Sequence, residues 1–193
     1  MWCSELVDLN NLQIQYKLFL NIGMGEVSLH ILCDVSPKAY GAVTYFLCIT
    51  KEGRVKVSFI ISRSKIALLK TLALARLELM VALISGRLGK YFQNTFPSFT
   101  KEIYLWSVSK IVRHWVKVSS KIWIPFVSYR VALVQPLTHP KLWNHCSGFE
   151  NPADLTTRGE SARKFLASSL WWTGPACLSR PLQSWLTMFA KST

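Results

Sequence analysis

Three acidic residues of this 193-residue chain have neighbours that suit metal-dependent chemistry. Asp34 ends an apolar run over residues 29–33, Glu78 has apolar residues one helical turn away, and Asp154 follows Asn-Pro-Ala. The chain has only 10 acidic residues against 23 lysines and arginines, so acids in apolar surroundings are unusual in it. Carboxylate oxygens are the ligands of hard divalent cations, and two such ions can activate water for attack on a phosphodiester. If the three acids converge, they form a candidate metal site.

Each acid also has a simpler structural interpretation. Asp154 falls in the first turn of an expected helix, where a negative charge complements the helix dipole. Asp34 precedes Ser-Pro-Lys and can serve as a turn residue at the end of a strand. Glu78 is harder to explain in this way, because Leu74 and Val81 are among its neighbours one turn away. The simpler interpretation of Glu78 is a buried ion pair with a lysine or arginine from another element.

The apolar pattern predicts the elements that must position these acids. Strands are expected over 29–33, 41–49, 55–61, 103–106 and 142–146, with a short strand around 12–14 and a basic connection over 62–73. Helices are expected over 74–93 and over 126–134. Another helix is expected to start after a cap at Ser107 or Ser109, and a last one to start at Asn151 with Pro152 in its first position. The first strand is apolar on both faces, so it should be central and covered on each side. This order predicts an α/β fold with helices packed on a five-stranded sheet.

The helix expected over 74–93 has one face of small side chains. Ala82, Ser85, Gly86 and Gly89 follow one another at one-, three- and four-residue spacing. Small residues on one face let a helix lie close to a sheet. Glu78 belongs to the same face, so its side chain is expected to point at the sheet rather than at water.

The formal charge of +13 favours polyanionic partners, because each neutralised phosphate releases condensed counterions. Charge alone also serves solubility. Cations expected near the acids, and assigned to nucleic-acid binding, are Arg63, Lys65, Lys70, Lys110, Arg113 and Lys117. Aromatic residues are interleaved with them, and such a mixture suits a groove that follows a nucleic-acid backbone. In the alternative interpretation the lysines form a solvated face, and for Trp115 and Trp123 a place in the core is favoured.

The five cysteines are scattered without a C-x-x-C pair, which argues against a disulfide framework and is typical of a reducing compartment. His139 and His145 lie near Cys146, but their spacing fits none of the usual zinc patterns. No secretory signal stands out, and the longest uncharged run, over 165–179, is too short for a membrane span. The sequence therefore predicts a cytoplasmic or nuclear protein that is not secreted and has no membrane partner.

The acids lie within longer motifs that follow one another in a defined order. These are Leu29-His30-Ile31-Leu32-Cys33-Asp34-Val35-Ser36 with Tyr40-Gly41-Ala42-Val43, Arg76-Leu77-Glu78-Leu79, Trp106-Ser107-Val108-Ser109-Lys110 with His114-Trp115, Glu150-Asn151-Pro152-Ala153-Asp154 with Arg158-Gly159, and Trp171-Trp172-Thr173-Gly174-Pro175. In these motifs, and in their order over nearly the whole chain, the sequence resembles the RNase H domain of BEL/Pao-type retrotransposon polyproteins. The likeness is far more specific than any single short motif.

The resemblance implies an RNase H-like fold with helices on both faces of a five-stranded mixed sheet. It further implies Mg²⁺ or Mn²⁺ as the cofactor, an RNA–DNA hybrid as the partner, and Asp34, Glu78 and Asp154 as catalytic, metal-binding acids. The family has one more acid, which belongs between Ser107 and Ser109, and Val108 stands there instead. Valine offers no lone pair and removes a negative charge, so we expect weak metal binding and reduced or absent hydrolysis.

Three functional hypotheses follow from these residues. The chain is a nucleic-acid-binding domain with impaired hydrolysis, or an active RNA–DNA hybrid ribonuclease in which a neighbouring acid or the substrate replaces the missing ligand, or a non-functional transposon remnant. We expect a lead-in from a polymerase-side region over 1–28, the RNase H-like domain over 29–165, and a Trp-rich connector over 166–193. The chain is then a piece of a longer polyprotein, whose other parts are possible partners.

Overall fold

The computed structural model describes residues 26–67, 73–98 and 100–180, together with Glu5, Val7 and Asn10. Five strands form one sheet in the order β3-β2-β1-β4-β5. They are β1 (Glu26–Val35), β2 (Ala39–Ile49), β3 (Val55–Ile66), β4 (Glu102–Ser107) and β5 (Trp143–His145). β1 pairs antiparallel with β2, and β2 with β3, whereas β4 runs parallel to β1 and β5 parallel to β4. The five-stranded mixed sheet with a central first strand is therefore confirmed.

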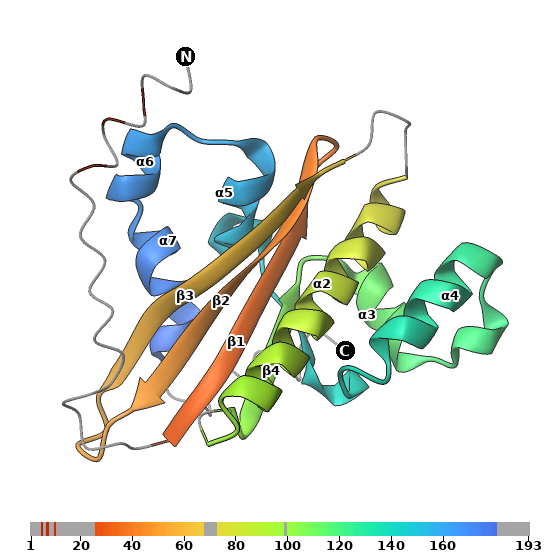
Figure 1. Ribbon diagram of the computed structural model, residues 1–193, viewed down its shortest axis with the longest axis horizontal. Helices are drawn as coiled ribbons and strands as arrows, with labels where there is room; N and C mark the ends of the chain where they lie inside the picture. Colours follow the sequence, from red (N-terminus) through yellow and green to blue (C-terminus); the bar gives the residue numbers. More distant parts are fainter. Residues whose placement is uncertain are drawn as a thin grey trace.

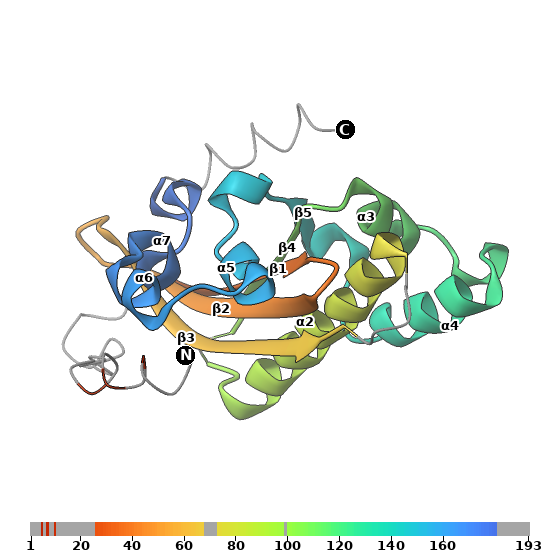
Figure 2. The ribbon, with the colours of Figure 1, turned by 90° about the horizontal axis from the view of Figure 1, so that it is seen from above.

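Helices cover both faces of the sheet (Figures 1 and 2). One face carries α2 (Leu74–Thr95), α3 (Lys110–Lys117) and α4 (Pro125–Val134), and the other carries α5 (Ala153–Arg158), α6 (Ala162–Ala167) and α7 (Ser169–Thr173). Short 3₁₀ helices complete the described chain at Ser120–Ile122, Pro140–Leu142, Gly148–Glu150 and Ala176–Ser179. Of the helices described, none is long and apolar enough to cross a lipid bilayer.

Several element boundaries differ from the sequence-based expectation. The basic connection expected over 62–73 is wrong in its first part, because β3 continues to Ile66 and pairs Arg63 with Ala42 and Lys65 with Tyr40. β3 lies at the edge of the sheet, where alternating charged side chains can face water without ending the strand. The short strand expected around 12–14 and Lys70 lie outside the described residues.

Two hydrophobic cores hold the layers together. On the first face, α2 packs on β1, and a Cβ at Gly89 would lie 3.5 Å from Ile31 Cδ1. The close contact of the small face with the sheet is therefore confirmed at Gly89, whereas a Cβ at Gly86 would meet Leu137 and Thr138 instead. On the second face, Tyr45, Trp171 and Leu178 are buried together, so residues 169–179 pack on the sheet. Trp115 and Trp123 are partly buried against the first core, as their interpretation as core residues predicts.

A neutral histidine is buried in the sheet between the strands that carry the site. His30 is 0 % exposed, and burial lowers its pKa to about 3. Its Nδ1 accepts a hydrogen bond of 3.2 Å from the indole N–H of Trp106, and its Nε2 lies 3.0 Å from Ser28 Oγ. Protonation would put a hydrogen on Nδ1, facing the indole donor, and this opposes the charged form.

We expect His30 to lower the stability of the fold in acid. The unfolded chain takes up this proton near pH 6.5 and the folded chain only near pH 3, so stability is lost as the pH falls between these values. In His30→Gln this loss is absent, and the difference in free energy of unfolding from wild type should move in favour of the variant by about 1.4 kcal/mol per pH unit. Urea denaturation of both proteins at about pH 6 and about pH 4 measures this difference. If the free energies of unfolding of wild type and His30→Gln change equally with pH, His30 is not neutral and buried in the folded domain.

Candidate functional site

Asp34 and Asp154 meet at the end of the sheet where β1 finishes. Asp34 is the next-to-last residue of β1, and Asp154 lies in the first turn of α5, which packs on β1 and β2. Burial and a hydrogen bond with Asp154 raise the pKa of Asp34 to about 7. A carboxyl group at this pKa retains a proton much more readily than an isolated one, as expected when a second carboxylate lies beside it.

The buried side chain of Asn151 anchors α5 to β1. Its Nδ2 donates a hydrogen bond of 2.9 Å to the carbonyl oxygen of Cys33, and its Oδ1 accepts one of 3.1 Å from the Ala153 N–H. The helix begins at Ala153 with Pro152 as its N-cap, so the predicted start, with Asn151 as N-cap and Pro152 first, is one position early. Asn151 nevertheless satisfies a free N–H at the helix start, and its second bond fixes Asp154 next to Asp34.

The other end of α5 is also bonded to the end of β1. The Ser36 hydroxyl donates a hydrogen bond of 2.6 Å to the carbonyl oxygen of Thr157, and the Thr157 hydroxyl lies 3.5 Å from Asp34 Oδ2. Thr157 is 2 % exposed. Asp34 thus faces a short helix that is held on both sides, which restricts the separation of the two carboxylates.

Gly41 lets α5 approach β2 closely. A Cβ at this position would lie 2.6 Å from Thr156 Oγ1, 3.1 Å from Ser64 Cβ and 3.2 Å from the carbonyl oxygen of Arg63. Gly41 pairs with Asp34 across the antiparallel β1–β2 ladder, so this contact lies directly beside the acidic pair. Any larger residue at position 41 must displace the Thr156 side chain on α5 or its neighbours on β3.

Gly41→Ala is expected to destabilise the domain by about 1–3 kcal/mol, because the added methyl group overfills the contact with Thr156. It should also lower the pKa of Asp34, since Asp154 moves away from it. Urea denaturation and an NMR titration of the aspartate carboxyl carbons measure the two effects. Gly148→Ala is the control, because a Cβ at Gly148 meets nothing within 4 Å. Equal changes in both variants would contradict this account of Gly41.

Glu78 lies on α2, on the other side of the end of β1. Burial raises its pKa, while a hydrogen bond with Ser109 lowers it. Its charge, like that of Asp34, raises the pKa of the Cys33 thiol, so both acids lie near Cys33. The structure thus brings Asp34 and Asp154 into hydrogen-bond contact, whereas Glu78 bonds to Ser109, the residue after Val108. Within the described ranges, no group of three or more His, Cys, Asp or Glu residues is arranged to hold a metal ion.

Val108 stands beside Asp34 at the end of the neighbouring strand. β4 pairs with β1 in parallel, with Ser107 opposite Cys33, so Val108 and Asp34 are the next residues along the two strands. Val108 is half-buried, and the Ser109 hydroxyl caps α3 by accepting a hydrogen bond of 3.2 Å from Val112 N–H. The cap at Ser109 is therefore confirmed, and Val108 is the first residue after β4, next to the strand that carries Asp34.

The surroundings of Val108 are positively charged. His145 on β5 is hydrogen-bonded to the backbone of Val108, and its pKa is lowered by burial and by the nearby charges of Arg113 and Lys110. Arg113 is only 8 % exposed, and its Nε has no hydrogen-bond partner among the residues described. The side of the site that lacks the fourth acid therefore carries cations, next to the Glu78 carboxylate that bonds to Ser109.

The other cations assigned to nucleic-acid binding have different surroundings. Arg63 and Lys65 are exposed on β3, in the half of that strand that lies at the same end of the sheet as Asp34. Lys110 and Lys117 are exposed on α3, whereas Arg113 between them is buried. Lys70 lies in the range 68–72 that the structure does not describe. Exposed cations thus lie on both sides of the acidic pair.

One ionic partner of the site was missed from the sequence. Arg158 Nε lies 2.5 Å from Asp154 Oδ1, and the side chains are 72 % and 28 % exposed. The four-residue spacing of an acid and an arginine on one helix was the signal that could have found this pair. The ion pair gives Asp154 a partner when no metal cation is bound, and it places the Arg158 guanidinium beside the two aspartates.

Residues 1–109 match the family described as "Pao retrotransposon-like RNaseH-like domain". Among solved structures, RNase H1 of the archaeon Halobacterium salinarum is similar, with 11 % identity, a TM-score of 0.37, and coverage of 65 % of this chain and 88 % of that one. LC11-RNase H1, isolated from compost by a metagenomic approach, is similar with 12 % identity, a TM-score of 0.40, and coverage of 74 % and 99 %. No curated protein sequence matches this chain.

The family match covers more than half of the chain and includes Asp34, Glu78 and Val108. It agrees with the resemblance drawn from the motifs, and the mixed sheet with its parallel β1–β4 pair and helices on both faces is the RNase H-like fold that the resemblance implies. The chain belongs to the Pao retrotransposon family of RNase H-like domains.

Proposed function

We propose that this domain binds an RNA–DNA hybrid over the end of the sheet that carries Asp34 and Asp154, and that it hydrolyses the RNA strand weakly or not at all. One observation supports the proposal: Ser107 pairs with Cys33, so Val108 and Asp34 each follow a residue of the same pair, and a carboxylate at Val108 would extend the acidic site. The exposed cations Arg63 and Lys65 support the binding part, since they flank the acids from the edge strand.

The donor set fits one Mg²⁺ or Mn²⁺ ion held by Asp34 and Asp154. Burial and a hydrogen bond with Asp154 raise the pKa of Asp34, and a divalent cation would relieve the repulsion between the two carboxyl groups. Such an ion supplies a Lewis acid and an activated water when it is bound. A second ion would need Glu78 and a further ligand, and Val108 offers none. We therefore assign metal binding to the two aspartates, with Glu78 as a weaker contributor from α2.

The residues of the chain itself have defined tasks in this proposal. Asn151 and Thr157 hold α5, and through it Asp154, against the end of β1. Arg158 offsets the negative charge of Asp154 through its Nε. Arg63 and Lys65 attract the phosphate backbone from the side of β3.

Hybrid binding is expected to be steeply salt-dependent, because it rests on phosphate contacts. Replacing both Arg63 and Lys65 with glutamine should lower the slope of log K against log salt by about 2, close to one for each lost contact. Fluorescence anisotropy of a labelled hybrid at several salt concentrations measures this slope. The control replaces Lys51 and Lys56, which are exposed at the opposite end of the sheet, and should leave the slope nearly unchanged.

Two results would contradict the proposal. If the domain binds no hybrid at low salt, or if the control substitutions weaken binding as much as those at Arg63 and Lys65, the hybrid does not bind at this end of the sheet. Magnesium-dependent cleavage of the hybrid by the wild-type domain, at a rate equal to that of a variant with the fourth acid restored, would favour the active ribonuclease of the sequence analysis instead.

A further inference from the structure

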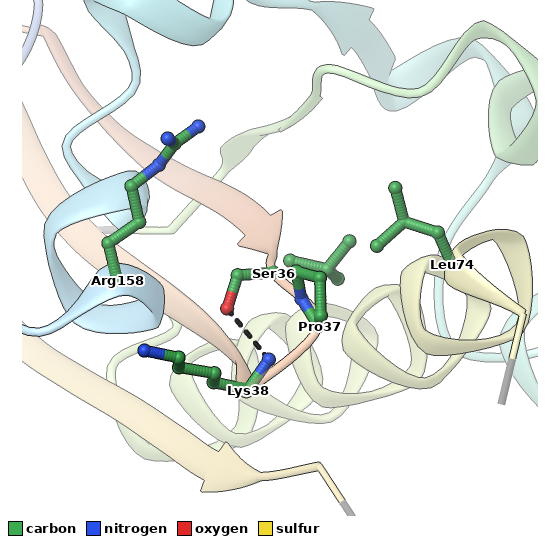
Figure 3. A pocket seen from close by; sticks show the side chains of 6 residues that line it. Ser36, Pro37, Lys38, Leu74 and Arg158 are labelled. Atoms are coloured by element: carbon green, nitrogen blue, oxygen red, sulfur yellow. Dashed lines mark hydrogen bonds between the residues drawn. The ribbon is translucent and has the colours of Figure 1, made fainter. Parts of the chain in front are cut away.

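A pocket of about 360 Å³ opens next to the acidic pair, at the turn between β1 and β2. Figure 3 shows that the turn, the start of α2 and the end of α5 contribute its walls. Its lining residues are Val35, Ser36, Pro37, Lys38, Leu74 and Arg158. The pocket is therefore one residue from Asp34 along β1 and four from Asp154 along α5, and whatever binds the acids extends toward it.

Both charged residues of the pocket are cations. Lys38 and Arg158 are exposed and lie on the same side of the turn, one on the turn itself and one on α5 (Figure 3). Arg158 uses its Nε for Asp154, which leaves the two terminal amino groups of the guanidinium to point outward as donors. The Ser36 hydroxyl is already used, because it donates to Thr157 and accepts from the backbone N–H of Lys38 and Ala39. The available donors are thus all positively charged.

The other walls of the pocket are apolar. Val35, Pro37 and Leu74 supply hydrocarbon, and Leu74 remains 48 % exposed at the start of α2. An anion flanked by a nonpolar ring fits this combination of two cations and an apolar wall. A backbone phosphate with its attached sugar has this chemistry.

We propose that the pocket of Lys38 and Arg158 binds one backbone phosphate of the nucleic-acid strand that lies over Asp34 and Asp154. This inference rests on the proposed function, and it adds a specific subsite to it. Arg158 links the subsite to the acids, because a single guanidinium can bond a phosphate through its terminal nitrogens and Asp154 through Nε. The phosphate is held by two charge-assisted contacts and its position relative to the acids is set by the length of α5.

Lys38→Gln is the direct test, since Lys38 is exposed and its replacement leaves the Arg158–Asp154 pair in place. Lys51→Gln, in the turn between β2 and β3 at the opposite end of the sheet, is the matched control. In the first experiment inorganic phosphate is titrated into each protein and the backbone amide shifts are followed by NMR. Saturable shifts at Ser36, Lys38, Ala39 and Arg158 are expected in wild type and in the control, and their loss is expected in Lys38→Gln.

The second experiment uses RNA–DNA hybrids in which one phosphate at a time is replaced by a neutral methylphosphonate. At one position the replacement should weaken binding to wild type and to Lys51→Gln by about tenfold, and it should have little further effect on Lys38→Gln. Equal losses in all three proteins at every position would overturn the phosphate subsite, as would non-saturating phosphate shifts spread over many basic residues. Saturable phosphate binding that depends on Lys38, in a protein that binds no hybrid, would support the anion site and refute the proposed function.

Discussion

Val108→Asp is expected to raise magnesium-dependent cleavage of the RNA strand of a hybrid by on the order of 100-fold over the wild-type domain. The register of β1 and β4 puts the new carboxylate beside Asp34, where it adds oxygen ligands and a negative charge to the acidic pair. The fold should tolerate this change, because Val108 is only half-buried and the charges of Lys110 and Arg113 act on the same region. A gel assay with a labelled hybrid in magnesium, and in excess chelator, measures the gain.

Two variants separate restored metal binding from a general effect of polarity. Val108→Asn has nearly the same shape as aspartate without its charge, and it should stay close to wild type. Val108→Asp combined with Asp34→Asn should lose the gain, since the new acid has no partner on β1. If Val108→Asp cleaves no faster than Val108→Asn, the absence of the fourth acid is not what limits hydrolysis.

Asn151→Ala is expected to destabilise the domain by about 3 kcal/mol, because the Cys33 carbonyl and the Ala153 N–H both lose their hydrogen-bond partner. Asn151 is 1 % exposed, so water cannot easily replace the lost hydrogen bonds. The same change releases α5, and the pKa of Asp34 should fall toward its ordinary value as Asp154 moves away. Urea denaturation and an NMR titration of Asp34 measure the two consequences.

Asn144→Ala is the matched control, because Asn144 is half-buried and donates only to the nearby Leu142 carbonyl oxygen. It should cost less than about 1 kcal/mol. Asn151→Asp tests the direction of the bonds: it can still accept from Ala153 N–H, but it places a buried carboxylate against the Cys33 carbonyl oxygen, so a loss at least as large as that of Asn151→Ala is expected at neutral pH. Equal stability of Asn151→Ala and Asn144→Ala would show that Asn151 does not anchor the helix.

The strands and the long helix could be predicted because their apolar and small side chains recur at the spacing of a strand or a helix. The small face of α2 identified the side of the helix that packs on β1, and its position at Gly89 against Ile31 bears this out. The extension of β3 to Ile66 could not be predicted in the same way. Arg63 and Lys65 resemble connection residues, and only the pairing with Ala42 and Tyr40 makes them part of a strand.

The candidate site, too, could be predicted from the sequence only in part. Asp34 and Asp154 follow strong local signals, a strand end and a helix start, and their meeting depends on where the two elements dock. Glu78 was expected on the sheet side of α2, but the bond it makes with Ser109 depends on the rotation of the whole helix. No local pattern shows that Asn151 reaches Cys33, since 118 positions separate the two residues.

That long-range amide bond sets the order in which the acids can come together. During synthesis the residues of β1 leave the ribosome more than a hundred positions before those of α5. A nascent chain that has finished β5 possesses every strand, yet its Asp34 faces no second carboxylate. The acidic pair therefore forms only after all five strands of the described sheet have been made, and a chain that ends before residue 151 has the sheet without the pair.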